Sequence, residues 1–390
     1  MIPSAPGATT SDDCLARLAL ARVTEPGSAA VWHALQEASA ADVWDALRAG
    51  EPLERLGQRA LDGLAARVAG VEPERELERL AAMGARVICP GDEEWPDGLD
   101  WHPEVMTGDV QEKAPPFVLF AKGPFRARAA AAASVAVVGA RAATAYGLEV
   151  AKELAFGLAE AGVTVVSGGA YGIDAAAHRG ALAARAAPTV AVLACGLDVV
   201  YPRGNDRLLA AVAADGLLLS ELPPGSHVTR LRFLVRNRLV AALTQGTVVV
   251  EAAARSGSLS TAGRAKDLGR HLMGVPGPVT SELTAGTHRL LREGATLVAS
   301  VSHVLEQVGP LDAASTTDLR GREHPRDRLA EQTRRILDAM PVRRPISAAR
   351  IAAAAGVSPL MVQVALPELV GAGLIELQDG GWRLTALGAS

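Results

Sequence analysis

The chain has 390 residues, of which 49% are hydrophobic, and a formal net charge of −4. This length allows a large core and more than one domain. We find neither a signal-peptide pattern nor an apolar run long enough to cross a bilayer, so we expect a cytoplasmic protein without a membrane span. The three cysteines, Cys14, Cys89 and Cys195, form no CxxC pair. We expect them to be buried thiols of a reducing compartment, not metal ligands.

Positive charge is concentrated in one part of the chain. Residues 226–300 contain ten Lys or Arg and four Asp or Glu, a local charge of about +6. Such asymmetry is typical of a protein with a polyanionic partner. Only four of the 39 basic residues are lysine. The codon bias of a GC-rich genome explains this, although arginine also suits bidentate phosphate contacts.

The first part of the chain has helical periodicity. Pro26-Gly27 and Gly50-Glu-Pro52 interrupt it, which predicts a small helical N-terminal domain over residues 1–83, of the SAM or helix-hairpin-helix type. A connecting α/β piece with strands near Val87–Cys89 and Pro115–Gly123 follows it.

From Ser134 onward, short β-branched runs alternate with Ala- and Leu-rich helical stretches. This order predicts a parallel sheet covered by helices on both faces, a doubly wound Rossmann-like fold over roughly residues 130–308 within an extended domain of 84–308. The predicted strands are 135–139, 163–168, 189–196, 217–221, 247–251, 271–275 and 295–298. The predicted helices lie near 146–161, 173–186, 205–214, 233–244 and 259–269.

The C-terminal part is expected to be a separate domain. Residues 309–327 are polar and indicate a linker. Residues 328–390 contain three predicted helices and a hairpin around Asp379-Gly-Gly381, the order of a winged-helix domain. These elements are expected at 328–339, 348–355, 360–370, 374–377 and 382–385.

The turn after the first parallel strand reads Gly139-Ala-Arg-Ala-Ala-Thr-Ala-Tyr-Gly147. A dinucleotide fold would have G-x-G-x-x-G here, but Arg141 stands where the second glycine would let the backbone approach a pyrophosphate. We therefore expect no dinucleotide cofactor. Arg141 instead predicts a phosphate held by a guanidinium beside a helix N-terminus, with a solvated loop residue as the alternative.

The turn after the second strand reads Ser167-Gly-Gly-Ala-Tyr-Gly-Ile-Asp-Ala-Ala-Ala-His178. Ser167, Gly168 and Gly169 predict a nest of N–H donors for an anion at the carboxyl end of a strand. Asp174 and His178 are four apart on a helix, so a local hydrogen-bonded pair is expected in preference to a metal site. Cys195, with no base evident beside it, is interpreted as a packing residue.

A third cluster combines arginines with a serine turn. Arg236 and Arg238 diverge by about 200° on a helix, so one is expected to contact a ligand and the other to brace the fold, with Asn237 between them. Phe233 is either a base-stacking ring or a core residue. The last predicted contacts open a helix and are Ser256, Gly257 and Ser258.

Several phosphate-competent turns along one sheet edge favour a nucleotide chain over a mononucleotide, and a single strand over a duplex. The predicted recognition helix of the C-terminal domain, Ser358–Leu369, contains no basic residue. It could not neutralise a DNA backbone, which argues against duplex recognition. Its apolar character suggests protein contact or self-docking.

The ordered motifs resemble those of the DNA-processing protein A (DprA/Smf) family. The matching segments are Val138-Gly-Ala-Arg141, Ser167–His178, Gly196-Leu-Asp-Val-Val-Tyr-Pro202, Phe233-x-x-Arg-Asn-Arg238, Glu251 with Arg255–Leu259, Val275-Pro-Gly277, and Gly286 with Gly294-Ala295. The departures are Leu234 in place of a usual proline, Tyr171 where arginine is common, and His288 where asparagine is frequent.

This resemblance implies binding of single-stranded DNA, displacement of single-strand-binding protein, and loading of the RecA recombinase during natural transformation. It also implies a homodimer, the three-domain architecture and no catalytic residues. The DNA contacts carried over are Arg141, Ser167–Gly169, Arg236 and Arg238, and Ser256–Ser258. Tyr171 puts one phosphate contact in doubt, although its ring could stack on a base.

The main alternative is an enzyme, a Rossmann-like phosphoribohydrolase resembling the LOG family. That class needs a glycine-rich loop that ends in a catalytic glutamate. The nearest text here, Gln245-Gly-Thr-Val-Val-Val-Glu251, lacks the glycine run. The sequence therefore favours a binding protein over this enzyme.

Overall fold

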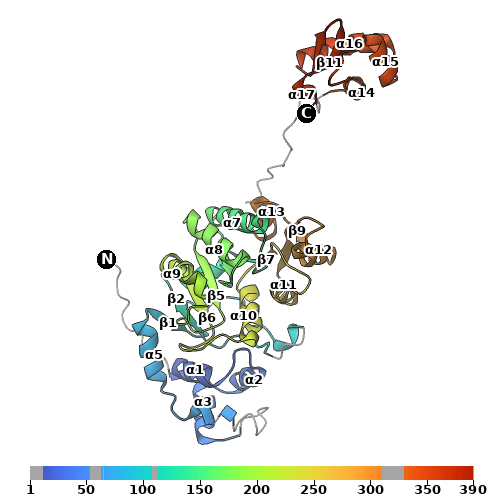
Figure 1. Cartoon of the computed structure of the whole chain (residues 1–390). Helices are drawn as coiled ribbons and strands as arrows, with labels where there is room; N and C mark the ends of the chain where they lie inside the picture. Colours follow the sequence, from blue (N-terminus) through green and yellow to red (C-terminus); the bar gives the residue numbers. More distant parts are fainter. Residues whose placement is uncertain (1–11, 53–62, 65, 108–111, 310–328, 390) are drawn as a thin grey trace. The chain divides into compact units, whose positions relative to one another are not determined.

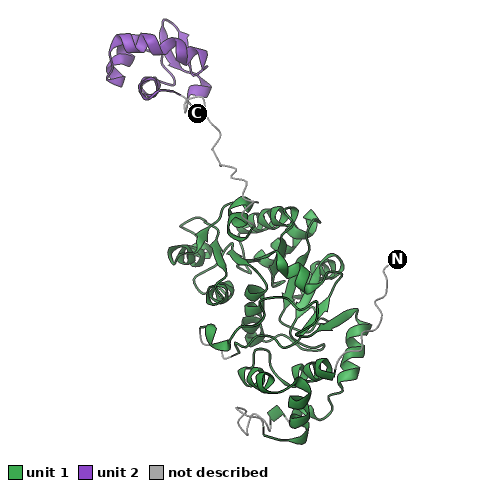
Figure 2. Ribbon diagram, turned by 180° about the vertical axis from the view of Figure 1, so that it is seen from behind, with its two compact units in different colours: residues 1–315 green, residues 316–390 purple. Residues whose placement is uncertain are grey.

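The computed structural model describes residues 12–52, 63–64, 66–107, 112–309 and 329–389. Two compact units divide the chain between residues 315 and 316 (Figure 2). Among the described helices, none is by itself long and apolar enough to cross a bilayer. Only α15 and α16 taken together, at a bend of 107°, pass that test of length and composition.

A nine-stranded sheet forms the centre of the first unit, in the order β1-β2-β6-β5-β4-β3-β7-β8-β9. The seven strands β6, β5, β4, β3, β7, β8 and β9 are parallel to one another. Strands β1 and β2 form an antiparallel edge next to β6. The predicted parallel, Rossmann-like sheet is confirmed strand by strand. The strands are β1 (Ala85–Ile88), β2 (Leu119–Lys122), β3 (Ser134–Val138), β4 (Thr164–Ser167), β5 (Thr189–Leu193), β6 (Leu217–Ser220), β7 (Gly246–Val249), β8 (His271–Gly274) and β9 (Thr296–Leu297).

Helices cover both faces of the sheet, which explains why its strands are almost uniformly apolar. Alternate side chains of β3 point to opposite faces. Val135 and Val137 pack with α7 and α8, whereas Ala136 and Val138 belong to the core beneath α10 and α11 (Figure 1). The helices that follow the strands are α6 (Ala127–Ala132), α7 (Ala145–Glu160), α8 (Ile173–Ala184), α9 (Asp206–Asp215), α10 (Arg230–Ala242), α11 (Ser258–Asp267), α12 (Ala285–Arg292) and α13 (Val301–Val308), with short 3-10 turns at 103–105, 203–205 and 282–284.

The N-terminal helices are α1 (Asp12–Val23), α2 (Ala29–Glu37), α3 (Ala40–Ala49) and α5 (Pro73–Ala82). Ser28 and Ser39 cap α2 and α3 by accepting hydrogen bonds from backbone N–H groups. Leu18 and Leu20 of α1 share one hydrophobic core with the β5 side chain of Leu193. A boundary between a helical domain and the sheet at residue 83 therefore stays a prediction.

The expectation of three free thiols is wrong for two of them. Cys14 in α1 and Cys89 just after β1 form a disulfide, with Cα atoms 6.0 Å apart, although 75 residues separate them in sequence. Helix α1 and strand β1 each contact α5, which brings these distant segments into one neighbourhood. Spacing along the chain gave no sign of this pairing.

The second unit contains α14 (Glu331–Asp338), α15 (Ala348–Ala355), α16 (Pro359–Gly371), the hairpin β10 (Ile375–Gln378) and β11 (Gly381–Leu384), and the short α17 (Ala386–Ala389). Asp379 and Gly380 form the hairpin turn, with φ of 49° and 76°, as a two-residue turn of the mirror-image type requires. The expected helices and hairpin are confirmed, whereas the assignment as a winged helix stays a prediction. The predicted linker, apart from Gly309, lies outside the described residues.

Candidate nucleic-acid interface

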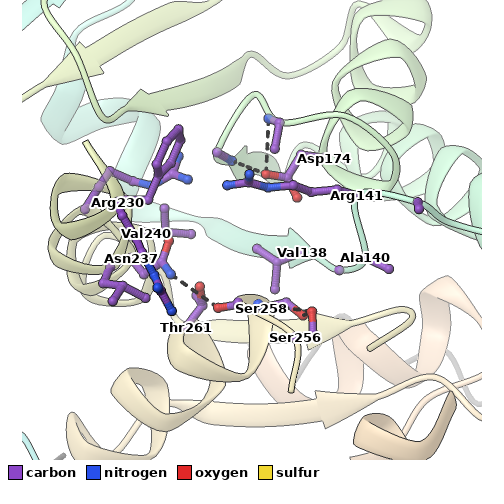
Figure 3. Close-up of a pocket in the computed structure, with 18 of the residues that line it drawn as sticks. Val138, Ala140, Arg141, Asp174, Arg230, Asn237, Val240, Ser256, Ser258 and Thr261 are labelled. Carbon is purple, nitrogen blue, oxygen red and sulfur yellow. Dashed lines mark hydrogen bonds between the residues drawn. The ribbon is translucent and has the colours of Figure 1, made fainter. Parts of the chain in front are cut away.

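A cavity of about 760 Å³ opens where the carboxyl ends of β3, β4 and β7 meet helix α10. The chain turns back in opposite directions from β3, towards β4 on one side and β7 on the other. Open parallel sheets bind their ligands at such switch points. Figure 3 shows Arg141 and Asp174 on one side of the cavity, Arg230 and Asn237 on α10, and Ser256, Ser258 and Thr261 opposite.

The charged side chains that line the cavity are four arginines and one aspartate, namely Arg141, Arg230, Arg236, Arg255 and Asp174. Of these, Arg141, Arg230 and Arg255 are exposed, whereas Arg236 and Asp174 are buried. The accessible charge of the cavity is therefore positive. Three flexible guanidinium groups at its mouth suit phosphate oxygens.

Arg141 lies over the ring of Phe233, with its guanidinium carbon 4.8 Å from the ring centroid. The ring of Tyr201 is 5.4 Å from that of Phe233, at a tilt of 54°. Phe233 is only partly buried and lines the cavity together with Tyr201. Phe233 is therefore a wall residue of the cavity, where aromatic faces and a cation lie side by side.

Arg236 is held at the back of the cavity. It is 7% exposed, its Nη1 donates to the carbonyl oxygen of Val192, and its Nε has no hydrogen-bond partner among the described residues. Burial lowers the pKa of Arg236, and the nearby Asp174 carboxylate opposes that change. Burial likewise raises the pKa of Asp174. These two groups form a buried charge pair in which neither is fully solvated.

Gly168 makes room for the Arg236 side chain. A Cβ atom at residue 168 would come within 2.6 Å of the guanidinium carbon of Arg236. We expect Gly168→Ala to displace that guanidinium and to lower the free energy of unfolding by about 1–3 kcal/mol, the usual cost of overpacking. Urea unfolding measures the change.

Gly263→Ala is the matched control for this substitution. Gly263 lies within α11, is exposed, and has nothing within 4 Å of an added Cβ. The control is expected to raise stability by up to about 1 kcal/mol, because alanine favours a helix over glycine. Equal effects of the two substitutions would show that Gly168 has no special relation to Arg236.

Two N–H groups of the glycine turn after β4 are hydrogen-bonded within the turn. The carboxylate of Asp174 accepts hydrogen bonds from the backbone N–H of Gly168, at 3.1 Å, and of Ala170, at 3.4 Å. This turn is a nest of donors, as expected, but a carboxylate of the same turn fills it. An external phosphate could not use these two N–H groups unless it displaced Asp174.

The N-terminus of α7 is filled in the same way. The Glu251 carboxylate, 1% exposed, accepts from the backbone N–H of Thr144 at 2.9 Å and from its hydroxyl at 2.5 Å. An added Cβ at Gly147 would lie 2.4 Å from that carboxylate, so glycine is needed there. Glu251 therefore occupies one anion position at this helix N-terminus, and the expected phosphate contact of Arg141 beside it stays a prediction.

The turn before α11 keeps a more open arrangement. The Ser256 and Ser258 hydroxyls are 2.7 Å apart, and the Ser256 hydroxyl oxygen accepts from the backbone N–H of Ser258 at 3.4 Å. The carbonyl oxygen of Gly257 accepts a hydrogen bond from the Asn237 side chain at 3.4 Å, which ties the turn to α10. Ser256, Gly257, Ser258 and Asn237 thus all line the cavity, as the sequence predicted that they would meet.

Three predicted contact residues do not line the cavity. Arg238 is 1% exposed and forms an ion pair with Glu221 at 2.7 Å. Ser167 is fully buried and donates to the carbonyl oxygen of Val137 at 2.7 Å. Gly169 is buried and has a φ of 69°. A Cβ atom added there would point at the side chains of Leu193 and Leu209. Of the two predicted arginines, Arg236 is therefore the one at the cavity.

The expected Asp174–His178 pair is wrong. The Nδ1 atom of His178 is 2.8 Å from the Thr189 hydroxyl, whose own hydrogen is donated to Val165. Cys195 is buried, and its thiol donates to the carbonyl oxygen of Val199 at 3.2 Å. Burial raises the pKa of Cys195 to about 11, which agrees with a packing role.

The sequence interpretation missed Arg230, Arg255 and Tyr201 as members of the cavity wall. Arg230 begins α10 and Arg255 immediately precedes the serine turn. Tyr201 lies in the loop after β5 and is 38% exposed. In the sequence, these residues lie close to motifs that were already recognised. Only the fold shows that they line the same cavity.

The fold and the cavity define a Rossmann-like protein with a basic, aromatic-lined site at the switch point of its sheet. The sequence profile of DNA recombination-mediator protein A matches residues 86–309. The chain belongs to this family, which processes DNA in recombination.

Similar proteins extend the match beyond the sheet. A DNA processing protein DprA of Mycobacterium tuberculosis is 44% identical over 384 residues, covering 95% of this chain and 94% of the relative. A protein Smf of Escherichia coli is 41% identical over 175 residues, 45% of this chain and 46% of the relative. The X-ray structure of DprA from Streptococcus pneumoniae aligns with a TM-score of 0.60 at 29% identity, covering 76% of this chain and 98% of that one.

Proposed function

We propose that the cavity binds single-stranded DNA, and that the protein acts in the cytoplasm as a recombination mediator and not as an enzyme. The proposed contacts are Arg141, Phe233, Arg236, Asn237 and the Ser256–Ser258 turn, to which the cavity adds Arg230, Arg255 and Tyr201. Ser167, Gly169 and Arg238 would support the site from behind.

The observation that carries this proposal is the cluster of Arg141 over the Phe233 ring with the tilted Tyr201 ring beside it. A single strand presents both backbone charge and unpaired base faces. Proteins that bind it combine a positive groove with aromatic rings on which bases stack. Both elements lie next to one another in this cavity.

The filled anion sites favour a strand over a free nucleotide. Nucleotide folds hold terminal phosphates on glycine turns and helix N-termini, but here Asp174 and Glu251 use those N–H groups. Glu251 is also the nearest match to the catalytic glutamate of a LOG-type enzyme, and it is buried against Thr144. The arginine side chains of the cavity remain available to bind the phosphates of a nucleotide chain.

Family membership supports the finer parts of the proposal. It favours displacement of single-strand-binding protein, loading of RecA onto incoming strands, and a homodimer. The exposed face of α16 has no basic residue and includes Leu360 and Val364, which are 68% and 72% exposed, so it agrees with a protein contact in preference to duplex DNA.

We expect salt-sensitive binding to oligo-dT and weak binding to a duplex of equal length. Each phosphate contact to a single strand adds about −0.7 to the slope of log K against log salt. Fluorescence anisotropy at several salt concentrations measures both the affinity and the slope. Equal or tighter binding to the duplex would contradict the proposal.

Replacing both Arg141 and Arg255 with alanine is expected to weaken oligo-dT binding at least tenfold and to flatten the salt slope by about 1.4, two contacts at about 0.7 each. Both side chains are exposed, so the fold should persist. Arg236 is a poorer target, because its burial ties it to stability.

Arg75→Ala is the control for this pair, since Arg75 is exposed and forms only a surface pair with Glu72 in α5. It changes charge without touching the cavity. An unchanged affinity in the well-folded double variant would refute the assignment of the DNA-binding site. Release of free base from nucleoside monophosphates would instead support the alternative of a phosphoribohydrolase.

A further inference from the structure

A second cavity, of about 390 Å³, lies in the same unit but away from the arginine-lined site. We call it the tryptophan cavity. It is bounded by α1, α2 and the segments 90–102 and 115–117, and its volume lies within the roughly 300–1,000 Å³ of ligand pockets. Three of the five tryptophans of the chain line it, Trp32, Trp95 and Trp101.

Trp101 is buried with the Arg238 guanidinium over its ring, whereas Trp32 and Trp95 are the more accessible rings of this cavity. The Trp101 ring donates from Nε1 to the Lys113 carbonyl oxygen at 2.8 Å. The Trp32 ring meets His102 edge to face, with centroids 5.1 Å apart at 87°. Trp32 and Trp95 are only partly buried, so their faces reach solvent through the cavity.

The acidic side chains near the tryptophan cavity differ in whether they are paired. Between Arg86 and Lys113 the sequence has no Lys or Arg. Three acids of this stretch are neutralised in ion pairs, Glu93 with Arg126, Glu94 with Arg86, and Asp97 with Arg128.

Asp100 is different. It lines the cavity and is exposed, and its carboxylate has no hydrogen-bond or ion-pair partner within the described part of the chain. The cationic side chain in the lining is Arg17, whose guanidinium is occupied by Asp13 at 2.7 Å and by the Phe117 carbonyl oxygen at 3.2 Å. The cavity thus presents one free carboxylate beside aromatic faces.

From this arrangement we propose that the tryptophan cavity binds an arginine side chain of a basic peptide segment in a partner protein. A guanidinium stacks on tryptophan faces and forms a bidentate pair with a carboxylate, so it satisfies both features at once. A nucleobase could also stack there, but its phosphate would be repelled by the free carboxylate of Asp100. The site is therefore distinct in charge from the DNA-binding cavity.

The walls of this site are covalently joined. The Cys14–Cys89 disulfide connects α1, which carries Arg17, to the residue before Pro90. The two sides of the cavity are therefore held together before any peptide arrives. A preformed site loses less entropy on binding.

The test titrates the full-length chain with the peptide acetyl-Gly-Arg-Gly-Arg-Gly-amide and with its citrulline analogue, which keeps the shape but loses the charge. Tryptophan fluorescence reports occupancy. We expect saturable quenching, with the arginine peptide at least tenfold tighter than the citrulline peptide, and unchanged binding when oligo-dT is present.

Asp100→Asn is expected to weaken arginine-peptide binding at least fivefold. Glu37→Gln is its matched control, because Glu37 is exposed at the end of α2 but does not line the cavity, and it should change affinity less than twofold. Trp32→Leu should reduce the quenching and weaken arginine-peptide binding, with circular dichroism confirming the fold. Equal binding of both peptides, an unaffected Asp100→Asn variant, or competition by oligo-dT would each overturn the proposal.

Discussion

Replacing Glu221 with alanine is expected to lower the free energy of unfolding by about 3–5 kcal/mol, the cost of leaving a buried charge unpaired. The charge is that of Arg238, whose Nη2 donates to Glu221 Oε1 at 2.7 Å. Their side chains are 1% and 6% exposed. Urea unfolding at neutral pH measures the loss.

The environment of Arg238 explains the size of this effect. Its Nε and Nη1 atoms have no hydrogen-bond partner among the described residues, and its guanidinium carbon lies 5.7 Å from the ring centroid of Trp101. Glu221 is therefore the ion-pair partner of Arg238 among the described residues. Water does not reach the guanidinium to replace the lost carboxylate.

The paired variant Glu221→Leu with Arg238→Met removes both charges together. It should recover most of the stability, because apolar side chains of similar volume often replace a buried ion pair at little cost. Asp45→Ala, which breaks a surface pair with Arg48, should change stability by less than about 1 kcal/mol.

The same paired variant separates the roles of the two arginines of α10. If Arg238 only braces the fold, the variant binds oligo-dT as tightly as the parent chain. A stable paired variant with tenfold weaker binding would instead place Arg238 among the DNA contacts.

The fold could be predicted from the sequence largely because its signals are local. A β-branched run such as Val135–Val138 must be buried on both faces, which only a covered parallel sheet provides. The turns at Arg141, Gly168 and Ser256 then had to meet at the carboxyl edge of that sheet. Their gathering in one cavity follows from topology alone.

What the sequence did not predict depends on contacts between distant residues. Glu251 fills the N-terminus of α7 although Thr144 lies 107 residues earlier. Cys14 reaches Cys89 through the packing of α1 near β1. A glycine-rich turn predicts that an anion will be bound, but not that the anion is a carboxylate of the same chain.

The pH dependence of stability should reveal the buried His178. Burial lowers the pKa of His178 to about 3, from an ordinary value of 6.5. The Thr189 hydroxyl gives its hydrogen to Val165, so His178 must donate from Nδ1, and its buried Nε2 has no partner among the described residues. A proton on Nε2 would therefore place a charge where nothing accepts it.

Acid should therefore destabilise the protein through this residue. Between pH 6.5 and pH 3 the unfolded chain binds a proton at residue 178 that the folded chain does not, so stability falls as pH falls. At pH 5 the loss is about 2 kcal/mol relative to pH 7.5.

His178→Asn, which keeps a donor for Thr189 but cannot titrate, should lack this part of the loss. Burial also raises the pKa of Asp174, which acts in the opposite direction, but this contribution is common to both proteins. Urea unfolding of the two proteins at pH 7.5 and pH 5 measures the difference, and parallel losses would show that His178 accepts its proton without unfolding.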